Sequence, residues 1–208
     1  MSETALDGAS HSPLVICGDG GAEHARRLGI PCHVIVGDLD SITPDTRRYY
    51  EEGGTQIVHI PDQEHNDFEK AIEYLAGNGH RAAKWNGNVR VLGMTGGRVD
   101  HTFSNFSVML RFSERFSSLL AIDADAEYRI LTAARNHCSI HCPLGTTISL
   151  IPFGEAHGIV TEHLRYPLTH ESLILGKREG LSNIVTGSPV TITIASGALL
   201  VAVSRGLD

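Results

Sequence analysis

The sequence has few positive charges and no long apolar run. Its 208 residues contain 17 Lys and Arg against 24 Asp and Glu, which gives a formal net charge of −7. A surface that binds a nucleic-acid duplex needs clustered cations, and no part of the sequence is rich in Lys and Arg. The longest apolar runs, such as Ala198–Val203, are far too short to cross a bilayer. We therefore expect neither a nucleic acid nor a membrane as a partner.

Cysteine is scarce as well. The four cysteines are Cys17, Cys32, Cys138 and Cys142, and their placement does not indicate an oxidising compartment. Residues 1–12 have neither a basic stretch nor an apolar run, so we expect no signal peptide. These features predict free thiols and a cytoplasmic protein.

The remaining composition is that of an ordinary globular protein, with 41% hydrophobic and 20% charged residues. In the first part of the chain, short runs rich in Val and Ile alternate with helical patterns. Several of these runs have no polar alternation, which is typical of strands buried on both faces of a parallel sheet. The predicted strands are Pro13–Cys17, His33–Val36, Gln56–Ile60, Val89–Leu92 and Leu119–Ile122.

Helix signals lie between these runs. Thr43 followed by Pro44 is an N-cap residue with proline at the first helical position. Asn66, followed three residues later by Glu69, resembles a capping box. Residues 1–124 are therefore predicted to form an α/β domain with a mostly parallel sheet. A further helix is indicated by apolar residues at helical spacing, namely Val99, Phe103, Phe106 and Leu110.

After about Asp125 the helix signals fade, and Gly, Pro and Asn separate short runs that are typical of strands. This pattern predicts an all-β sandwich or barrel domain over residues 125–208. Its predicted strands are Glu127–Leu131, Cys138–Cys142, Thr147–Ile151, Ile159–His163, Ser172–Leu175, Val190–Ile194 and Leu199–Val203.

Acidic residues follow the predicted strands of the first domain. Ligands of a parallel α/β sheet bind beyond the carboxyl ends of its strands, so we expect at least five carboxylates to meet at one edge of one sheet. If the segment between Asp38 and Asp40 is extended, these two side chains point to the same face. The acids are Asp19 after the first strand, Asp38 and Asp40 after the second, Asp62 after the third, Asp67 at the next helix start and Asp100 after the fourth.

Carboxylates that crowd together repel one another unless cations compensate their charge. Mg²⁺ takes oxygen ligands and bridges carboxylates to substrate phosphates, and phosphoryl-type transfer depends mostly on positioning and charge neutralisation. The pairs Gly20-Gly21 and Gly96-Gly97 each precede a predicted helix and let a phosphate approach the main chain. Each acid taken alone is more often a turn residue or a helix cap, but the set predicts a metal–phosphate site.

Two other motifs have simpler explanations. The segment His137–Cys142 resembles a zinc site, but strand alternation places its cysteines and its histidines on opposite faces. The segment Gly18–Glu23 imitates a dinucleotide fingerprint, but Glu23 occupies the third glycine position, and Asp19 would repel a pyrophosphate bound without metal. We favour a structural strand in the first case and the metal–phosphate site in the second.

Six short motifs resemble, in order and spacing, those of thiamine pyrophosphokinases. Each motif alone is weak, but the ordered series is highly specific and extends from about Val15 to Val203. The motifs are Asp19-Gly20-Gly21-Ala22, Gly37-Asp38-Leu39-Asp40-Ser41, Asp62-Gln63, Asp67-Phe68-Glu69-Lys70-Ala71, Gly96-Gly97-Arg98-Val99-Asp100-His101 and Ser182-Asn183.

The resemblance implies an α/β nucleotide-binding domain, a thiamine-binding β domain and a homodimer with sites at the subunit interface. It also implies Mg²⁺-dependent transfer of diphosphate from ATP to the thiamine hydroxyl, with AMP leaving. The implied catalytic acids are Asp38, Asp40, Asp67 and Asp100. Asp19, Asp38, Asp40 and Asp67 would hold Mg²⁺ and the ATP phosphates, Gly20, Lys70 and Arg98 would lie near the phosphates, Gln63 would contact the nucleotide, and Asp100, Ser182 and Asn183 would face thiamine.

Some positions depart from the family pattern. Ile184 follows Ser182-Asn183 where an acid is frequent, and Asn66 stands where Thr is common. The only tryptophan, Trp85, lies outside the β domain, in which some members stack a tryptophan on thiamine. Two alternatives stay open, namely a related pyrophosphokinase acting on another alcohol, such as a hydroxymethyl pterin, and a non-catalytic thiamine or nucleotide sensor.

Overall fold

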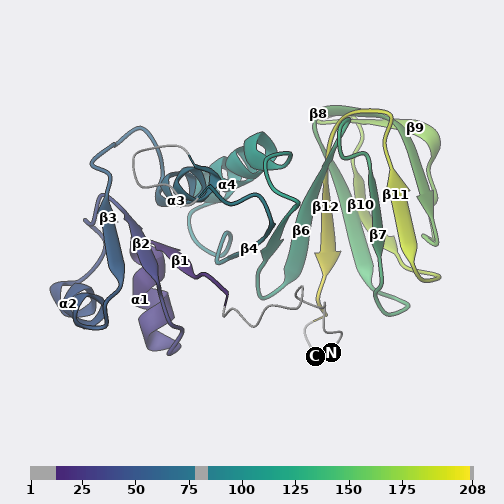
Figure 1. The fold of residues 1–208 in the computed structure, drawn as a ribbon. Helices are drawn as coiled ribbons and strands as arrows, with labels where there is room; N and C mark the ends of the chain where they lie inside the picture. Colours follow the sequence, from purple (N-terminus) through teal and green to yellow (C-terminus); the bar gives the residue numbers. More distant parts are fainter. Residues whose placement is uncertain (1–12, 78–83, 207–208) are drawn as a thin grey trace. The chain divides into compact units, whose positions relative to one another are not determined.

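The computed structural model describes residues 13–77 and 84–206, which divide into one compact unit ending at Tyr74 and another beginning at Leu75. The first unit is built on a three-stranded parallel sheet with β2 in the middle (Figure 1). Its strands are β1 (Ile16–Gly18), β2 (Val34–Gly37) and β3 (Gln56–His59), and its helices are α1 (Asp19–Arg27), α2 (Pro44–Glu52) and the start of α3 (Asp67–Ala76).

Helices cover both faces of this sheet. Ile35 of β2 lies in one apolar cluster with residues of α1 and with Tyr50 of α2. Its neighbours Val34 and Val36 lie in a second cluster with Tyr74 of α3. Successive strand residues point to opposite faces, so an unbroken apolar run serves both clusters, as the sequence predicts for a buried parallel strand.

The predicted helix starts are confirmed. Thr43 is the N-cap residue of α2, its side chain accepts a hydrogen bond from the main-chain N–H of Thr46, and Pro44 is the first helical residue. Asn66 caps α3 in the same way, since its side-chain oxygen accepts from the N–H of Glu69 at 2.8 Å. Both caps fix the chain just beyond a strand, where the candidate site residues lie.

The second unit contains a large, mostly antiparallel sheet that curls into a half-barrel (Figure 1). The strand order is β4-β5-β6-β12-β8-β11-β7, and β9 and β10 also pair with β8. Its strands are β4 (Asn88–Leu92), β5 (Ser118–Ile122), β6 (Ala126–Thr132), β7 (His137–Ile140), β8 (Thr147–Glu162), β9 (Thr169–Ile174), β10 (Gly180–Ile184), β11 (Val190–Thr193) and β12 (Ser196–Ser204).

Helix α4 (Val99–Phe112) buries only part of its predicted apolar stripe. Phe106 packs edge-on against Tyr128 of β6, with 5.1 Å between the ring centroids, and Met109 is fully buried. At the start of the helix, however, Val99 and Phe103 are 83% and 68% exposed. The helix is therefore anchored by its second half.

The predicted fold class is confirmed, but the assignment of all five early strands to one sheet was wrong. β4 and β5 are parallel to each other, and β5 then pairs antiparallel with β6. The main-chain N–H of Asp123 donates to the carbonyl of Ala126 in the turn between β5 and β6, which ties β4 and β5 to the large sheet. Apolar patterns identify a buried strand but do not specify which strand lies beside it.

Two further strand predictions were inaccurate. The runs Thr147–Ile151 and Ile159–His163 belong to the single strand β8, in which Gly154 and Gly158 have positive φ angles. The pairing of β8 with β12 and with β9 shifts register around these glycines, which let the strand bend and continue. The sequence prediction mistook this bend for a turn between two strands. β10 was missed, because its residues Gly180–Ile184 include only two apolar side chains.

Within the described residues, no helix combines the length and the apolar character needed to cross a membrane. The predicted domain boundary between residues 124 and 125 stays a prediction.

Candidate functional site

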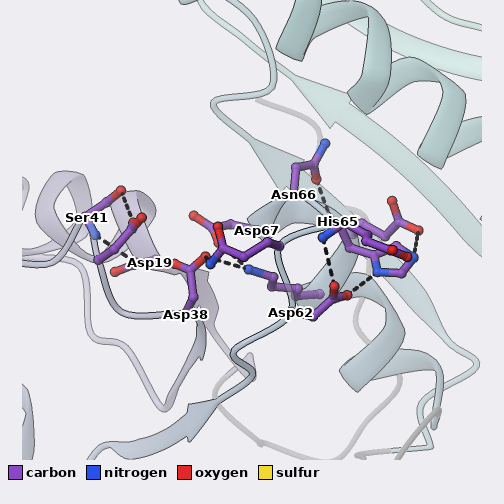
Figure 2. Close-up of polar contacts among 12 residues, drawn as sticks. Asp19, Asp38, Ser41, Asp62, His65, Asn66 and Asp67 are labelled. Carbon is purple, nitrogen blue, oxygen red and sulfur yellow. Dashed lines mark hydrogen bonds and ion pairs between the residues drawn. The ribbon is translucent and has the colours of Figure 1, made fainter.

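Three carboxylates of the first unit come together where β1 and β2 end. Asp19 is the first residue of α1, directly after β1, and Asp38 and Asp40 follow β2. One oxygen from each of the three lies within 4.8 Å of the others. Figure 2 shows Asp19 and Asp38 next to each other, with Asp67 beside them. The predicted convergence of acids holds for these residues, and their role as metal ligands stays a prediction.

The assignment of Asp100 to the edge of the same sheet was wrong. Asp100 lies in the first turn of α4, after a strand that belongs to the other sheet and the other unit. Gly20 also differs from its predicted place, because it lies inside the first turn of α1 and not before the helix. A Cβ atom added to Gly20 would meet no atom within 4 Å, so there is open space beside it.

Glycine at position 37 is what allows the acids to lie so close. A Cβ atom built on Gly37 would lie 2.7 Å from Cβ of Asp19 and 3.2 Å from Oδ1 of Asp67. No side chain fits in that space unless Asp19 moves. Gly37 therefore brings the end of β2 against the start of α1.

Asp19 is a buried carboxylate whose two oxygens have different surroundings. Its side chain is 0% exposed, and its Oδ2 accepts a hydrogen bond from the main-chain N–H of Ser41 at 2.9 Å. Its Oδ1 is buried and has no hydrogen-bond partner among the described residues. A buried carboxylate oxygen without a partner is costly, and a cation with oxygen ligands would remove that cost. The donor set Asp19, Asp38 and Asp40 fits Mg²⁺, which prefers carboxylate oxygens.

Lys70 supplies a positive charge from within the protein. Its side chain is only 3% exposed, and its Nζ lies 3.0 Å from Oδ2 of Asp38. The Nε2 of Gln63 donates to the same oxygen at 3.0 Å. Lys70 holds the pKa of Asp38 below its usual range, chiefly through the hydrogen bond from its own Nζ. Lys70 and Gln63, both predicted site residues, therefore meet at Asp38.

Asp67 is in a different electrostatic state. Its Oδ1 lies 3.7 Å from Nζ of Lys70, and its oxygens do not belong to the group formed by the other three acids. Burial raises the pKa of Asp67, and the charge of Asp19 raises it further. Asp38 is thus held in its ionised form, whereas its neighbour Asp67 is pushed toward the neutral form.

The backbone between Asp38 and Asp40 is not extended. Leu39 has a φ angle of 68°, in the left-handed region that apolar residues rarely adopt. The alternation argument for Asp38 and Asp40 therefore fails, although both still contribute to the three-acid group. A turn at Leu39 brings the two carboxylates together in place of the pleat of a strand.

Sequence reasoning missed His65. Its Nδ1 contacts Oδ2 of Asp62, and its Nε2 lies 3.4 Å from Oε1 of Glu69 (Figure 2). The hydrogen bond with Asp62 raises the pKa of His65, and His65 lowers the pKa of Asp62. The spacing of these residues, three and four apart around the start of α3, is the signal that could have found the group.

Arg98 and Asp100 form an ion pair in the second unit. Arg98 Nε donates to Asp100 Oδ1 at 3.1 Å, and the terminal nitrogen Nη2 contacts Oδ2, so the pair is bidentate. Both side chains are exposed. Arg98 lowers the pKa of Asp100 to about 2, chiefly through these hydrogen bonds. Asp100 is therefore fully ionised at neutral pH.

Ser182 and Asn183 lie on β10, the strand that the sequence did not predict. Ser182 is exposed, whereas Asn183 is buried and engaged inside the protein. Asn183 Oδ1 accepts from the main-chain N–H of Tyr166 at 3.0 Å, and its Nδ2 donates to the Tyr166 carbonyl at 2.7 Å. It thereby fixes the backbone of Tyr166, whose ring is 65% exposed. The predicted contacts of Ser182 and Asn183 with thiamine stay predictions.

The structural explanation of the segment His137–Cys142 is confirmed. Cys138 and Cys142 pack against the apolar core of the second unit, while His137 and His141 are exposed. Within residues 13–77 and 84–206, the only His, Cys, Asp or Glu group close enough to hold a metal is the acidic one in the first unit. The four cysteines are free thiols, as expected.

Two protein-family models match successive parts of the chain. A family model described as "Thiamin pyrophosphokinase, catalytic domain" matches residues 7–120. A second, described as "Thiamin pyrophosphokinase, vitamin B1 binding domain", matches residues 130–199. The chain belongs to the thiamin pyrophosphokinase family.

Individual relatives agree with this placement. Thiamine pyrophosphokinase 1 of Oryza sativa subsp. japonica is 31% identical over 200 residues, covering 86% of this chain and 75% of the relative. Thiamine pyrophosphokinase 3 of the same organism is 30% identical over 207 residues, covering 89% and 76%. The crystal structure of thiamine pyrophosphokinase from Bacillus subtilis has the same fold, with a TM-score of 0.80 at 24% identity over 93% of this chain and 88% of that one.

The thiamin pyrophosphokinase models divide the candidate residues between them. The catalytic-domain match contains the acids of the first unit together with Lys70, Arg98 and Asp100. The vitamin B1 binding match contains Tyr166, Ser182 and Asn183. Membership of the family, which six short motifs indicated, is thus confirmed by matches over most of the chain.

Proposed function

We propose that this protein transfers a diphosphate group from ATP to the hydroxyl of thiamine, with Mg²⁺, giving thiamine diphosphate and AMP. The observation that carries the proposal is the group formed by Asp19, Asp38 and Asp40 in a chain of this family. Within that group, the buried Asp19 Oδ1 has no hydrogen-bond partner among the described residues, and a bound cation would compensate its charge. A metal–triphosphate complex supplies the cation together with the group to be transferred.

In the proposed reaction the thiamine hydroxyl oxygen bonds to the β-phosphorus of ATP. The bond between that phosphorus and the oxygen bridging to the α-phosphate breaks, and AMP leaves with that oxygen. The hydroxyl proton passes to a carboxylate oxygen of the site. Such a transfer needs little covalent help from the protein, so its residues act mainly by positioning and by neutralising charge.

The first unit is suited to the phosphates. Asp19, Asp38, Asp40 and Asp67 would hold Mg²⁺, which would supply positive charge to neutralise the phosphate oxygens. Lys70 lies beside Asp38 and holds it in its ionised form, and we assign its ammonium the further role of donating to a phosphate oxygen. Gln63 donates to the same carboxylate, and we place the nucleotide beside it.

The second unit is suited to a cationic alcohol. Thiamine carries a positive thiazolium ring, and the pKa of Asp100 is lowered to about 2, so this carboxylate is negative at neutral pH. The exposed ring of Tyr166 offers a flat face on which a cationic ring can stack, in place of the tryptophan of some family members. Ser182 is exposed beside Asn183, and we assign its hydroxyl a hydrogen bond to thiamine.

We also propose that the protein acts in the cytoplasm as a homodimer. The family resemblance supports a dimer, as do the exposed apolar side chains of Leu92, Val99 and Phe103, which are 66%, 83% and 68% exposed. Free thiols are consistent with a reducing compartment. Light scattering would then give a mass about twice the 22.5 kDa of the chain, whereas a monomer that turns over would contradict a shared site.

One experiment separates this function from its alternatives. The protein is incubated with Mg-ATP and, in parallel, with thiamine, with a hydroxymethyl pterin or with no acceptor, and AMP is measured. We expect AMP formation to depend on thiamine. AMP that appears only with the pterin would favour the related pyrophosphokinase, and binding of thiamine without AMP would favour a sensor.

A further inference from the structure

Two acids of α1 hold the segment that follows β2. Asp19 and Glu23 are one helical turn apart and therefore lie on the same face of α1. Asp19 Oδ2 accepts from the main-chain N–H of Ser41 at 2.9 Å, and Glu23 Oε1 accepts from that of Thr43 at 2.7 Å. Both acceptors belong to one rigid helix, so the segment 38–43 is fixed at two points near its end.

Glu23 also reaches the start of α2. Its Oε2 accepts a hydrogen bond from the hydroxyl of Thr46 at 2.9 Å, and Thr46 is only 1% exposed. The same hydroxyl accepts from Arg26 at 2.7 Å, which links a second residue of α1 to this group. Glu23 thus connects α1 to both the N-cap residue and the first turn of α2.

The segment held in this way is strained. Leu39 sits between Asp38 and Asp40 with a φ angle of 68°. A left-handed conformation is unfavourable for a non-glycine residue, and it persists only where the surroundings impose it. The two hydrogen bonds from α1 are such a constraint, since they fix the backbone immediately after Asp40. Without them the segment is free to relax Leu39 and separate the acids.

We propose that Glu23 is a positioning residue, which holds the segment 38–43 so that Asp38 and Asp40 keep their oxygens beside those of Asp19. The inference rests on the proposed function, because the three acids matter as a set only if they bind a metal. It also explains why an acid replaces glycine at the third position of the motif that resembles a dinucleotide fingerprint. The Thr43 N–H lowers the pKa of Glu23, in keeping with an ionised acceptor.

The test is direct binding of Mn²⁺, a substitute for Mg²⁺, to the full chain without nucleotide, measured by calorimetry or by electron paramagnetic resonance. We expect Glu23→Ala to weaken Mn²⁺ binding by about tenfold, as is typical when a group that orients a metal ligand is lost. Glu23→Gln keeps an oxygen that can accept from Thr43, and we expect a smaller loss of about threefold or less.

The matched control is Glu51→Ala. Glu51 is an exposed glutamate of α2 paired with Arg47 at 2.8 Å, so its removal changes the net charge equally without touching the segment. We expect its Mn²⁺ affinity to equal that of the wild type. If Glu23→Ala also binds Mn²⁺ as the wild type does, the positioning role is wrong while the metal site stands. If the wild type itself binds no Mn²⁺, the metal site of the proposed function fails, and the role of Glu23 falls with it.

A second measurement covers the case in which Glu23→Ala does not fold. Thr46→Val removes the contact to Oε2 but leaves the bond from Thr43 to Oε1, so we expect nearly unchanged Mn²⁺ binding. In turnover assays Glu23→Gln should lower kcat with KM for thiamine unchanged, and higher Mn²⁺ should restore part of kcat. A change confined to KM for thiamine, or no rescue by metal, would contradict the proposal.

Discussion

The Nζ atom of Lys70 lies 3.0 Å from Oδ2 of Asp38, and the Lys70 side chain is only 3% exposed. The same Nζ atom also lies 3.7 Å from Oδ1 of Asp67. One buried ammonium therefore stands between two carboxylates that would otherwise repel each other. This relationship makes the acid-rich edge of the first unit stable before any metal binds, and it leads to the first prediction.

Lys70→Met should destabilise the protein by about 2–3 kcal/mol in a buffer with EDTA, because it leaves two partly buried carboxylates without their cation. Mg²⁺ should restore part of that stability by compensating the same charges. The measurement is chemical denaturation with and without Mg²⁺. The control is Arg47→Met, which breaks an exposed pair and should cost about 0.5 kcal/mol or less. Equal effects of the two variants would contradict the compensating role of Lys70.

Asp38→Asn and Asp40→Asn should each lower kcat by about a hundredfold or more, because each removes a charge held in place for the phosphates. KM for thiamine should change little. Steady-state kinetics with both substrates checks this.

The same two variants should differ in stability. Asp40 is exposed, and its loss relieves repulsion at little cost. Asp38→Asn leaves buried Lys70 with only its longer ion pair, to Asp67, so the free energy of unfolding of this variant should fall. Wild-type turnover in both variants would mean that these acids are structural.

Tyr166→Ala and Asn183→Ala should separate binding from stability in the second unit. Tyr166 is 65% exposed, so its loss should raise KM for thiamine without changing the free energy of unfolding. Asn183 is 7% exposed and holds the Tyr166 backbone, so its loss should cost about 2 kcal/mol as well as raise KM. Tyr166→Phe keeps the ring and serves as the control. If Tyr166→Ala leaves KM unchanged, thiamine does not stack there.

His65 should titrate above its ordinary value of 6.5 in the folded protein, since Asp62 stabilises the charged ring. Proton NMR of the ring measures this, and Asp62→Asn should return the midpoint toward 6.5. A raised histidine pKa stabilises the fold below the unfolded value and loses that effect as pH rises through the folded value. The lowered pKa of Asp62 acts above its ordinary 3.8, so the pair contributes fully between about 3.8 and 6.5. An unshifted His65 midpoint would show that the contact with Asp62 is not formed in solution.

The parts of the site that the sequence predicted are those governed by local rules. Thr43-Pro44 and Asn66 signal helix starts through the hydrogen bonds that their side chains can accept, whatever the rest of the fold. Asp19 and Asp38 were found because buried parallel strands are visible as apolar runs, and the residues after them lie at one edge.

The remaining features depend on contacts between distant residues. The local sequence places Lys70 on the polar face of an amphipathic helix. Only the fold shows that it is buried against Asp38. A leucine does not predict a left-handed turn. The turn at Leu39 is accompanied by a hydrogen bond from Ser41 to Asp19 of α1, which the local sequence does not reveal. Asp100 was assigned to the wrong sheet because an apolar run such as Val89–Leu92 does not indicate which strand it pairs with.

The most direct test of the central claim is the phosphorus balance of a single reaction, followed by ³¹P NMR with Mg-ATP and thiamine. Transfer of an intact diphosphate predicts that thiamine diphosphate and AMP rise together in equal amounts, with no ADP, and that Asp40→Asn forms neither at a comparable rate. Appearance of ADP with thiamine monophosphate would contradict attack at the β-phosphorus, and so would AMP formed without thiamine diphosphate.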